Sequence, residues 1–231
     1  MTFGVVYIHS GGIWSDICEL SRSTLPAGVP VTVIDVADHA ESLQCRLSLA
    51  DNLPYDRTLY LDCDVVYCQP EFPEWLTRFE LPRGIAMSAW WVANQSWGWQ
   101  ADWSQYLQPG TISNLPHWFR SPNAGLMLLE KHAAPILEAW RETWQRIGTP
   151  LIEPAYVEAF KDRPQQFDNL PGDFHQPSTR ATAEWMQPER HQFIHAIIST
   201  EDKLNEMQRC LEFAGQNNPA VLSGAWADVA G

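Results

Sequence analysis

Residues 57–67, RTLYLDCDVVY, join an apolar run to a pair of aspartates, Asp62 and Asp64, that flank Cys63. The apolar run predicts a buried strand that ends where the carboxylates begin. Because successive side chains of an extended chain point to opposite sides, both carboxylates are expected on the same side. Two like charges held this close disfavour each other's ionised form, so the pair needs a compensating partner.

The chain on the N-terminal side of this stretch alternates between strand and helix patterns. Strands are predicted at residues 3–9 and 29–35, and helices at about 14–25 and 39–53. Strand–helix–strand–helix–strand with short connections predicts a parallel α/β sheet with right-handed crossovers. The strands are almost continuously apolar, which predicts that the sheet is covered on both faces.

The rest of the chain continues this mixture of elements. Further elements are predicted at 71–79 (helix), 83–91 (strand), 124–130 (strand), 132–147 (helix), 153–160 (helix), 190–198 (strand) and 201–213 (helix). No stretch resembles a linker, so one domain is expected over residues 1–215, followed by a tail at 216–231. A tryptophan-rich insert without periodicity occupies about 91–122.

Composition narrows the range of functions. The chain has 231 residues, 45% of them hydrophobic, with a formal net charge of -13. Such a surface repels phosphate backbones and anionic lipid, so neither nucleic acid nor a membrane surface is an expected partner.

The cysteines and the N-terminal sequence bear on the location of the protein. The five cysteines are Cys18, Cys45, Cys63, Cys68 and Cys210. Their odd number and scattered spacing favour reduced thiols and a cytoplasmic location. The N-terminus, MTFGVVYIHSGG, has no basic region and only a short apolar run, so no signal peptide is expected. No stretch is apolar enough for a membrane span.

The aspartate pair predicts a metal site. Ligands of parallel α/β sheets bind beyond the carboxyl ends of the strands, which is where Asp62 and Asp64 fall. Carboxylate oxygens suit Mg²⁺ or Mn²⁺, which keep open positions for water and substrate phosphates. We therefore interpret the pair as half of a metal–diphosphate site. The alternative is that Asp62 caps the following segment and Asp64 is simply solvated.

Segments along most of the chain resemble one enzyme family. PYDRTLYLDCDVV (54–66) resembles the D-x-D segment of GT-A-fold glycosyltransferases, particularly glycosyltransferase family 8 with its glycogenin-like and lipopolysaccharide galactosyltransferase-like members. SPNAGLMLLEK (121–131), EPAYVEAF (153–160) and FIHAI (193–197) resemble further segments of that family in the same order. The resemblance spans residues 3–198. It implies a Rossmann-like, mostly parallel central sheet flanked by helices in a single domain.

The resemblance also implies roles for individual residues. Asp62, Asp64 and His195 would ligate Mn²⁺ or Mg²⁺, and Asp62 would also touch the ribose. The nucleotide-sugar would be held by Tyr7, His9, Ser10, Arg46, Asp62, Asn123 and Gly125. Glu153 would lie beside the anomeric carbon, and Glu153 and Asn123 are the catalytic candidates.

Several of these residues have structural alternatives or depart from the family pattern. Arg46 is equally explained as an exposed helix arginine, His195 as a satisfied half-buried histidine, and Glu153 as a first-turn acid favoured by the helix dipole. The family has an acidic residue where this chain has Ile152. The family's late glycine and lysine are also missing, and whether Lys203 takes the place of that lysine stays open.

The tryptophan-rich insert has two interpretations. Six of the twelve tryptophans lie between Trp90 and Trp118. Large side chains help an irregular excursion to bury itself, which is the structural explanation. In the resembled family this position faces the acceptor, and aromatic walls with a few polar groups suit sugar binding. The polar groups would come from Gln95, Gln100, Asp102 and Gln105.

These observations predict a glycosyltransferase. The expected reaction moves a hexose from a nucleotide-diphosphate sugar, expected to be a UDP-sugar, to a carbohydrate or other hydroxyl acceptor. Retention of anomeric configuration follows from the resemblance alone. One rival is a sugar-phosphate nucleotidyltransferase, although HSGGIWSD lacks the G-x-G-x-R loop of that class. The other rival is a non-catalytic nucleotide-sugar or carbohydrate-binding module on the same fold.

Overall fold

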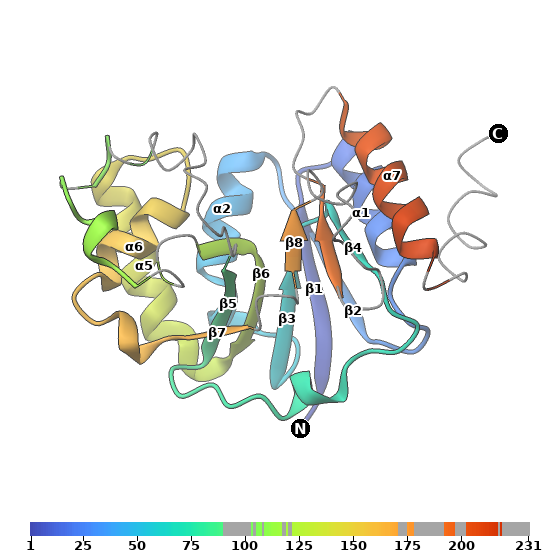
Figure 1. Cartoon of the computed structure of the whole chain (residues 1–231), viewed down its shortest axis with the longest axis horizontal. Helices are drawn as coiled ribbons and strands as arrows, with labels where there is room; N and C mark the ends of the chain where they lie inside the picture. Colours follow the sequence, from blue (N-terminus) through green and yellow to red (C-terminus); the bar gives the residue numbers. More distant parts are fainter. Residues whose placement is uncertain are drawn as a thin grey trace.

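A six-stranded sheet with strand order β2-β1-β3-β6-β5-β7 forms the centre of the molecule (Figure 1). The computed structural model describes residues 1–89, 103, 105–107, 109–116, 119, 122–170, 175–177, 192–196, 202–216 and 218. The strands of the sheet are β1 (Phe3–His9), β2 (Val31–Asp35), β3 (Arg57–Leu61), β5 (Ile85–Ala89), β6 (Pro122–Glu130) and β7 (Asp168–Leu170).

The sheet is mostly parallel, as predicted, with one strand reversed. β1 pairs in parallel with β2 and β3, and β5 pairs in parallel with β7. β6 is antiparallel to both of its neighbours, β3 and β5. Leu61, the last residue of β3, therefore lies opposite Leu126, near the start of β6. This reversal brings the first residues of β6 to the sheet edge at which β1 and β3 end.

A second, three-stranded sheet has the order β4-β9-β8. It consists of β4 (Val65–Tyr67), β8 (His175–Pro177) and β9 (Phe193–His195). β4 begins one residue after the second aspartate, and its Val65 lies opposite His195 in an antiparallel pairing. This short sheet places a histidine from late in the chain beside the aspartate pair.

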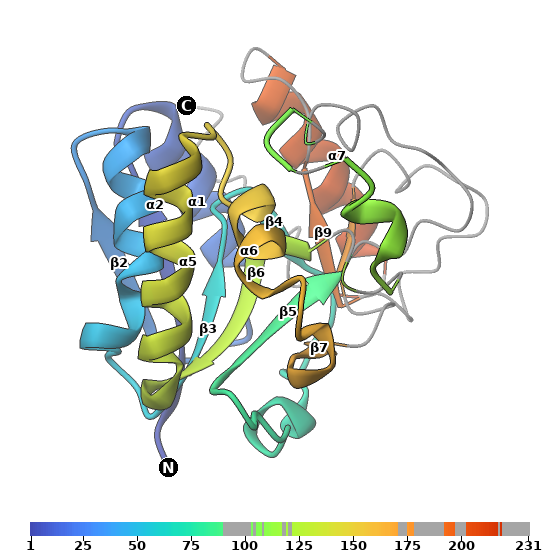
Figure 2. The same ribbon diagram turned by 90° about the vertical axis from the view of Figure 1, so that its left-hand side faces the viewer.

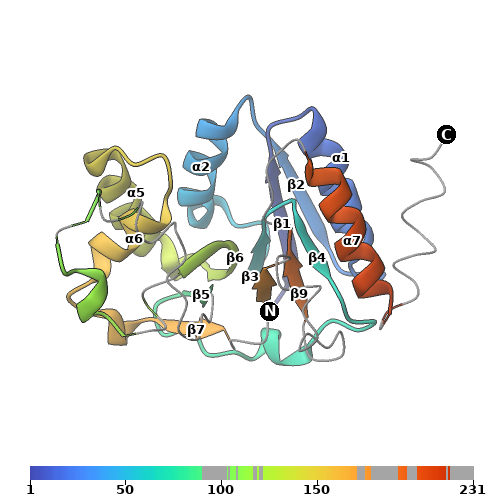
Figure 3. The same cartoon turned by 45° about the horizontal axis from the view of Figure 1, so that its top comes forward.

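Helices cover the central sheet on both faces. They are α1 (Ile13–Ser23), α2 (His39–Leu47), α5 (Ala134–Ile147), α6 (Glu153–Phe160) and α7 (Lys203–Gly215). α1 and α7 lie together on one face, whereas α2, α5 and α6 lie on the other (Figure 3). The view in Figure 2 shows α2 and α5 side by side. The helix predicted at 39–53 ends at Leu47 and is followed by a 3-10 turn at 49–52. The helix predicted at 71–79 is wrong, because the structure has only a 3-10 turn there, at 74–77.

The alternation of side chains along β1 divides the core in two. Val5 and Tyr7 belong to a cluster that includes α1, α7 and the second sheet, while Val6 and Ile8 belong to a cluster with α2, α5 and α6. All four residues are buried. This confirms the prediction of a sheet covered on both faces.

Part of the predicted organisation falls outside the described residues. Of the insert at 91–122, Trp103 and Phe119 are buried in the core beside α5 and α6, and most other tryptophans of the insert lie outside the described residues. So do residues 219–231 of the predicted tail. The acceptor platform and the domain boundary stay predictions. In the described part of the chain, no helix has the length and apolar character needed to cross a bilayer.

Candidate metal and nucleotide-sugar site

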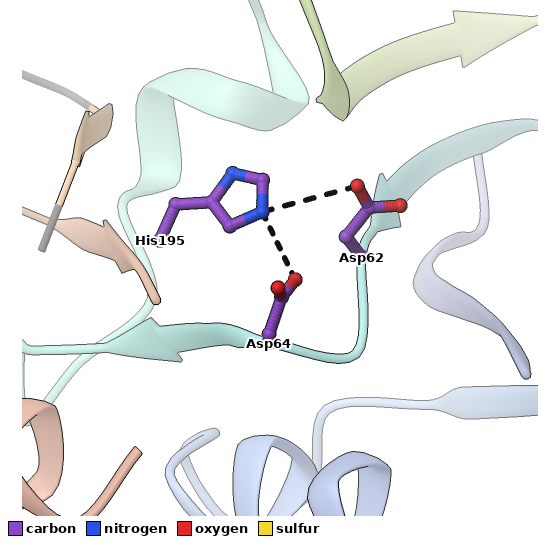
Figure 4. Close-up of side chains that lie close together, drawn as sticks. All are labelled: Asp62, Asp64 and His195. Carbon is purple, nitrogen blue, oxygen red and sulfur yellow. Dashed lines mark ion pairs between the residues drawn. The ribbon is translucent and has the colours of Figure 1, made fainter. Parts of the chain in front are cut away.

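Three potential metal ligands meet at the carboxyl edge of the central sheet. Nε2 of His195 lies 2.9 Å from Oδ1 of Asp64 and 4.0 Å from Oδ2 of Asp62 (Figure 4). One ligand atom from each residue lies within 4.8 Å of the others. The structure thus brings together the three residues that were expected to bind the metal. β4 and β9 hold them in place, because Ala196 donates a backbone hydrogen bond of 2.8 Å to Asp64.

Gly125 packs against this group from β6. A Cβ at position 125 would lie 2.6 Å from Cε1 of His195 and 2.7 Å from Oδ2 of Asp62. Both distances are shorter than any ordinary carbon contact, so a larger residue would displace the potential ligands. The amide of Gly125 also donates a hydrogen bond of 2.7 Å to Oδ1 of Asn123. The absence of a side chain at Gly125 is therefore part of how the site is built.

Each aspartate has a basic partner within the protein. Nη2 of Arg46 donates to Oδ1 of Asp62 at 2.5 Å, and the Tyr60 hydroxyl donates to the same oxygen at 2.5 Å. Nζ of Lys203 donates to Oδ2 of Asp64 at 2.8 Å. Two carboxylates are thus matched by two cations. The interpretation of Arg46 as an exposed helix residue is wrong, because only 7% of it is exposed.

These neighbours shift the protonation of the group. Burial on its own would raise the pKa of Asp64, but His195 and Lys203 outweigh it and hold that pKa well below its usual range. Burial on its own would lower the pKa of His195, whereas the Asp64 carboxylate raises it by more, so the pKa lies above 6.5. Asp64 is consequently ionised at neutral pH and ready to act as a ligand.

The donor set fits a divalent cation. Two carboxylates and one imidazole nitrogen suit Mn²⁺, and carboxylates with water or phosphate oxygens suit Mg²⁺. Asp62, Asp64 and His195 would supply the protein ligands. The space that Gly125 leaves beside His195 and Asp62 keeps all three side chains able to converge.

A cavity of about 110 Å³ lies next to the aspartates. It is lined by Ile8, His9, Ser10, Trp14, His39, Ser42, Arg46, Asp62, Cys63 and Asp64. His9, Ser10 and Arg46 were expected to hold the nucleotide-sugar, and the structure places all three around this cavity. His39, Ser42 and Trp14 also line the cavity but were not predicted from the sequence. They lie on α1 and α2, which both start at the carboxyl edge of the sheet, so topology alone signals them.

Tyr7 is placed differently from the other predicted residues. Its ring is fully buried in the core under α1, where Ser21 donates a hydrogen bond of 3.1 Å to its hydroxyl. It points to the face of β1 opposite to that of Val6 and Ile8. The tyrosine side chain is therefore a core residue.

The residues expected near the sugar form a second cluster on the α6 side of Asp62. Glu153, the first residue of α6, is half-buried and lies near the backbone of Ala124 on β6. Burial raises the pKa of Glu153, and the nearby Arg46 offsets part of this rise. Nε of Arg46 is buried and has no hydrogen-bond partner among the described residues. The structure therefore assembles Arg46, Glu153 and Asn123 around the start of β6.

Ile152, which departs from the family pattern, is a core residue. It is 1% exposed, and its carbonyl accepts a hydrogen bond of 2.6 Å from Nε1 of Trp140. An acidic side chain at this position would be buried among apolar groups. This explains physically why the carboxylate is missing from this face of α6.

No family model and no curated protein matches the chain, but solved structures do. A glycosyltransferase involved in glycosylation of the major capsid of PBCV-1 aligns with 90% of this chain and 100% of its own, at a TM-score of 0.62 and 12% identity. The galactosyltransferase LgtC, solved with donor and acceptor sugar analogs, aligns over 92% and 95% at a TM-score of 0.53 and 13% identity. The fold is the GT-A glycosyltransferase fold.

A third GT-A relative extends the comparison to animals. Mouse xyloside xylosyltransferase 1 aligns with 85% of this chain and 98% of its own, at a TM-score of 0.54 and 10% identity. These relatives match the chain over nearly their whole length, so the GT-A architecture accounts for both the central sheet and the helices around it. At such low identity the likeness establishes the fold alone.

Proposed function

We propose that this chain is a metal-dependent glycosyltransferase that transfers a hexose from a nucleotide-diphosphate sugar to a hydroxyl acceptor. The observation that supports this most directly is the group of Asp62, Asp64 and His195, which lies beside a cavity at the carboxyl edge of a GT-A sheet. A UDP-sugar is the expected donor and a carbohydrate the expected acceptor. LgtC, which shares the fold, was solved with donor and acceptor sugar analogs. The cytoplasmic location expected from the cysteines belongs to the same proposal.

The cavity accounts for binding of the nucleotide part of the donor. His9, the last residue of β1, and Ser10 line the cavity together with His39 and Trp14, which offer polar atoms and an aromatic surface. The diphosphate would lie next to Asp62 and the metal ligands. The chemistry that a bound divalent cation supplies is neutralisation of charge on the leaving diphosphate.

The residues around the start of β6 account for binding of the hexose. The free N–H of Arg46 can donate to a sugar hydroxyl or a phosphate oxygen, and Asn123 lies at the start of β6, two residues before Gly125. Glu153 is the only carboxylate among the predicted sugar-side residues. Its raised pKa leaves it a larger neutral fraction than an exposed glutamate has, which suits contact with sugar hydroxyls. Retention of the anomeric configuration is proposed only from the resemblance to glycosyltransferase family 8.

The proposal is tested by turnover. The purified chain is incubated with a panel of nucleotide sugars, with and without Mn²⁺, and release of nucleotide diphosphate is measured. We expect release with one donor class that depends on the metal, and a loss of roughly 100-fold or more in Asp64→Asn, since one ligand is removed. Asp162→Asn, an equal change at an exposed position, is the matched control. Turnover that Asp64→Asn leaves intact contradicts the metal-dependent mechanism.

A binding module that has lost catalysis is the second candidate. It is favoured by the burial of Ile152, which leaves Glu153 without an acidic neighbour on its N-terminal side. This alternative predicts that nucleotide sugars raise the melting temperature of the protein in the presence of Mn²⁺ but are never consumed. Consumption of any donor by the unaltered chain excludes it.

A further inference from the structure

Lys203 lies on the far side of Asp64 from His195. It is the first residue of α7 and only 5% of it is exposed. Its ammonium donates to Oδ2 of Asp64 at 2.8 Å and to the carbonyl oxygen of Ala196. It also lies 5.7 Å from the ring centre of Trp14, which lines the donor cavity. Lys203 is therefore a buried cation that is held by hydrogen bonds next to Asp64, one of the potential metal ligands.

Each of the two aspartates is matched by a basic side chain without any metal. Asp62 and Asp64 contribute two negative charges, and Arg46 and Lys203, each within hydrogen-bond distance of one of them, contribute two positive charges. The aspartate pair thus has its compensating partners inside the protein. The compensating partner that was expected for the pair is therefore present in part as Arg46 and Lys203, besides any divalent cation.

We propose that Lys203 competes with the divalent cation for Asp64, so that the cation binds weakly by itself and tightly only together with a diphosphate. This inference rests on the proposed function and adds to it how binding of the metal depends on binding of the diphosphate. A divalent ion that binds Asp64 adds positive charge next to Lys203, and the ammonium of Lys203 opposes it at short range. The negative charge of a diphosphate offsets this added positive charge, so each ligand strengthens the binding of the other.

The opposite role for Lys203 makes a distinct prediction. A residue that only orients a metal ligand supports the metal, and its removal weakens metal binding, typically by 10-fold to 100-fold. A competing cation weakens metal binding, and its removal strengthens it. The sign of the change therefore decides between the two roles of Lys203.

The experiment measures binding of Mn²⁺ alone to the full chain, by electron paramagnetic resonance of the free ion or by calorimetry. We expect Lys203→Met to bind Mn²⁺ roughly 10-fold more tightly than the unaltered chain, because one positive charge next to Asp64 is removed. Lys203→Gln, which keeps hydrogen-bond donors but not the charge, is expected to show the same gain. Lys131→Met removes the same charge at the opposite edge of the sheet and is expected to change nothing. Equal or weaker binding by both Lys203 variants overturns the inference.

A second arm tests the dependence on diphosphate. Inorganic pyrophosphate serves as the probe because it carries the diphosphate without a base, and a protein-free titration corrects for its own binding of Mn²⁺. We expect pyrophosphate to increase the affinity of the unaltered chain for Mn²⁺ and to do so less in Lys203→Met. An equal increase in both proteins overturns the coupling.

Folding of the variants is checked by circular dichroism. If neither Lys203 variant folds without metal, recovery of the folded signal on addition of Mn²⁺ supports the inference, and no recovery overturns it. The measurement of Mn²⁺ binding needs no nucleotide-sugar donor. Its result therefore does not depend on whether the chain turns over a donor. A chain that turns over a donor but shows no gain in the Lys203 variants keeps the proposed function and loses the inference.

Discussion

The pairing of Asp64 with His195 shows how a single contact sets the chemistry of the site. A histidine donating to a buried carboxylate keeps its proton to higher pH, while the carboxylate keeps its charge to lower pH. In the metal-free protein, the raised pKa of His195 adds stability that is present below pH 6.5 and is lost as the pH rises through the folded pKa. The lowered pKa of Asp64 adds stability that is lost only as the pH falls through its folded pKa.

This protonation predicts the pH dependence of metal binding. A metal ligand must be unprotonated, so protons compete with Mn²⁺ for Nε2 of His195. We expect the affinity for Mn²⁺ to rise from pH 6.5 upward, by close to tenfold per pH unit until the raised folded pKa of His195 is reached. Mn²⁺ titrations across this range measure it. His132→Asn, at the opposite edge of the sheet, is expected to keep the same profile, and an affinity independent of pH contradicts a role for His195 as a ligand.

The elements that meet at the site come from distant parts of the sequence. Of the site residues, those on predicted strands and helices, such as Asp62, Asp64 and Arg46, could be located from periodicity and from the topology of parallel sheets. β4 and β8 have three residues each, too few to show a period, whereas the strand predicted at 190–198 contains β9. The contact of Lys203 with Asp64 spans 139 residues, and no local pattern could reveal it. Its role appears only when α7 is packed against β4.

At Gly125, β6 lies close to β9 and to the end of β3, and this predicts the effect of adding a side chain there. We expect Gly125→Ala to weaken Mn²⁺ binding by more than about 10-fold, because the new methyl group displaces His195 and Asp62. Gly148→Ala is the matched control. It strains a left-handed helix end with φ of 64° and costs about 1 kcal/mol of stability, but it has no neighbours within 4 Å. Metal titrations and urea unfolding of both variants separate loss of the site from loss of stability.

On the scale of the whole molecule, the two edges of the central sheet, where its strands start and end, have different roles. The carboxyl edge of β1 and β3 carries the ionisable groups of the candidate site. The opposite edge carries the ion pair of Arg57, at the start of β3, with Glu130, at the end of β6. Arg57 is 5% exposed and also donates a hydrogen bond of 3.1 Å to the carbonyl oxygen of Leu76. This edge stabilises the fold at a distance from the ligands.

The separation of the two edges makes a prediction about stability. We expect Arg57→Met to lower the free energy of unfolding by about 3 kcal/mol, because it removes the arginine partner of Glu130 in a mostly buried position. The folded fraction should bind Mn²⁺ with unchanged affinity. Urea denaturation measures the first quantity and metal titration the second. A change in metal affinity in this variant would show that the two edges are coupled.

The reversed direction of β6 has a consequence for how this architecture can be engineered. Ala89, the last residue of β5, pairs with Pro122, the first residue of β6, so the intervening chain leaves and rejoins the sheet at one place. A graft of that excursion from a related enzyme would therefore join at two neighbouring points and leave the strand order untouched. Exchanging the segment in this way requires no change to the central sheet, because the two junctions are already adjacent.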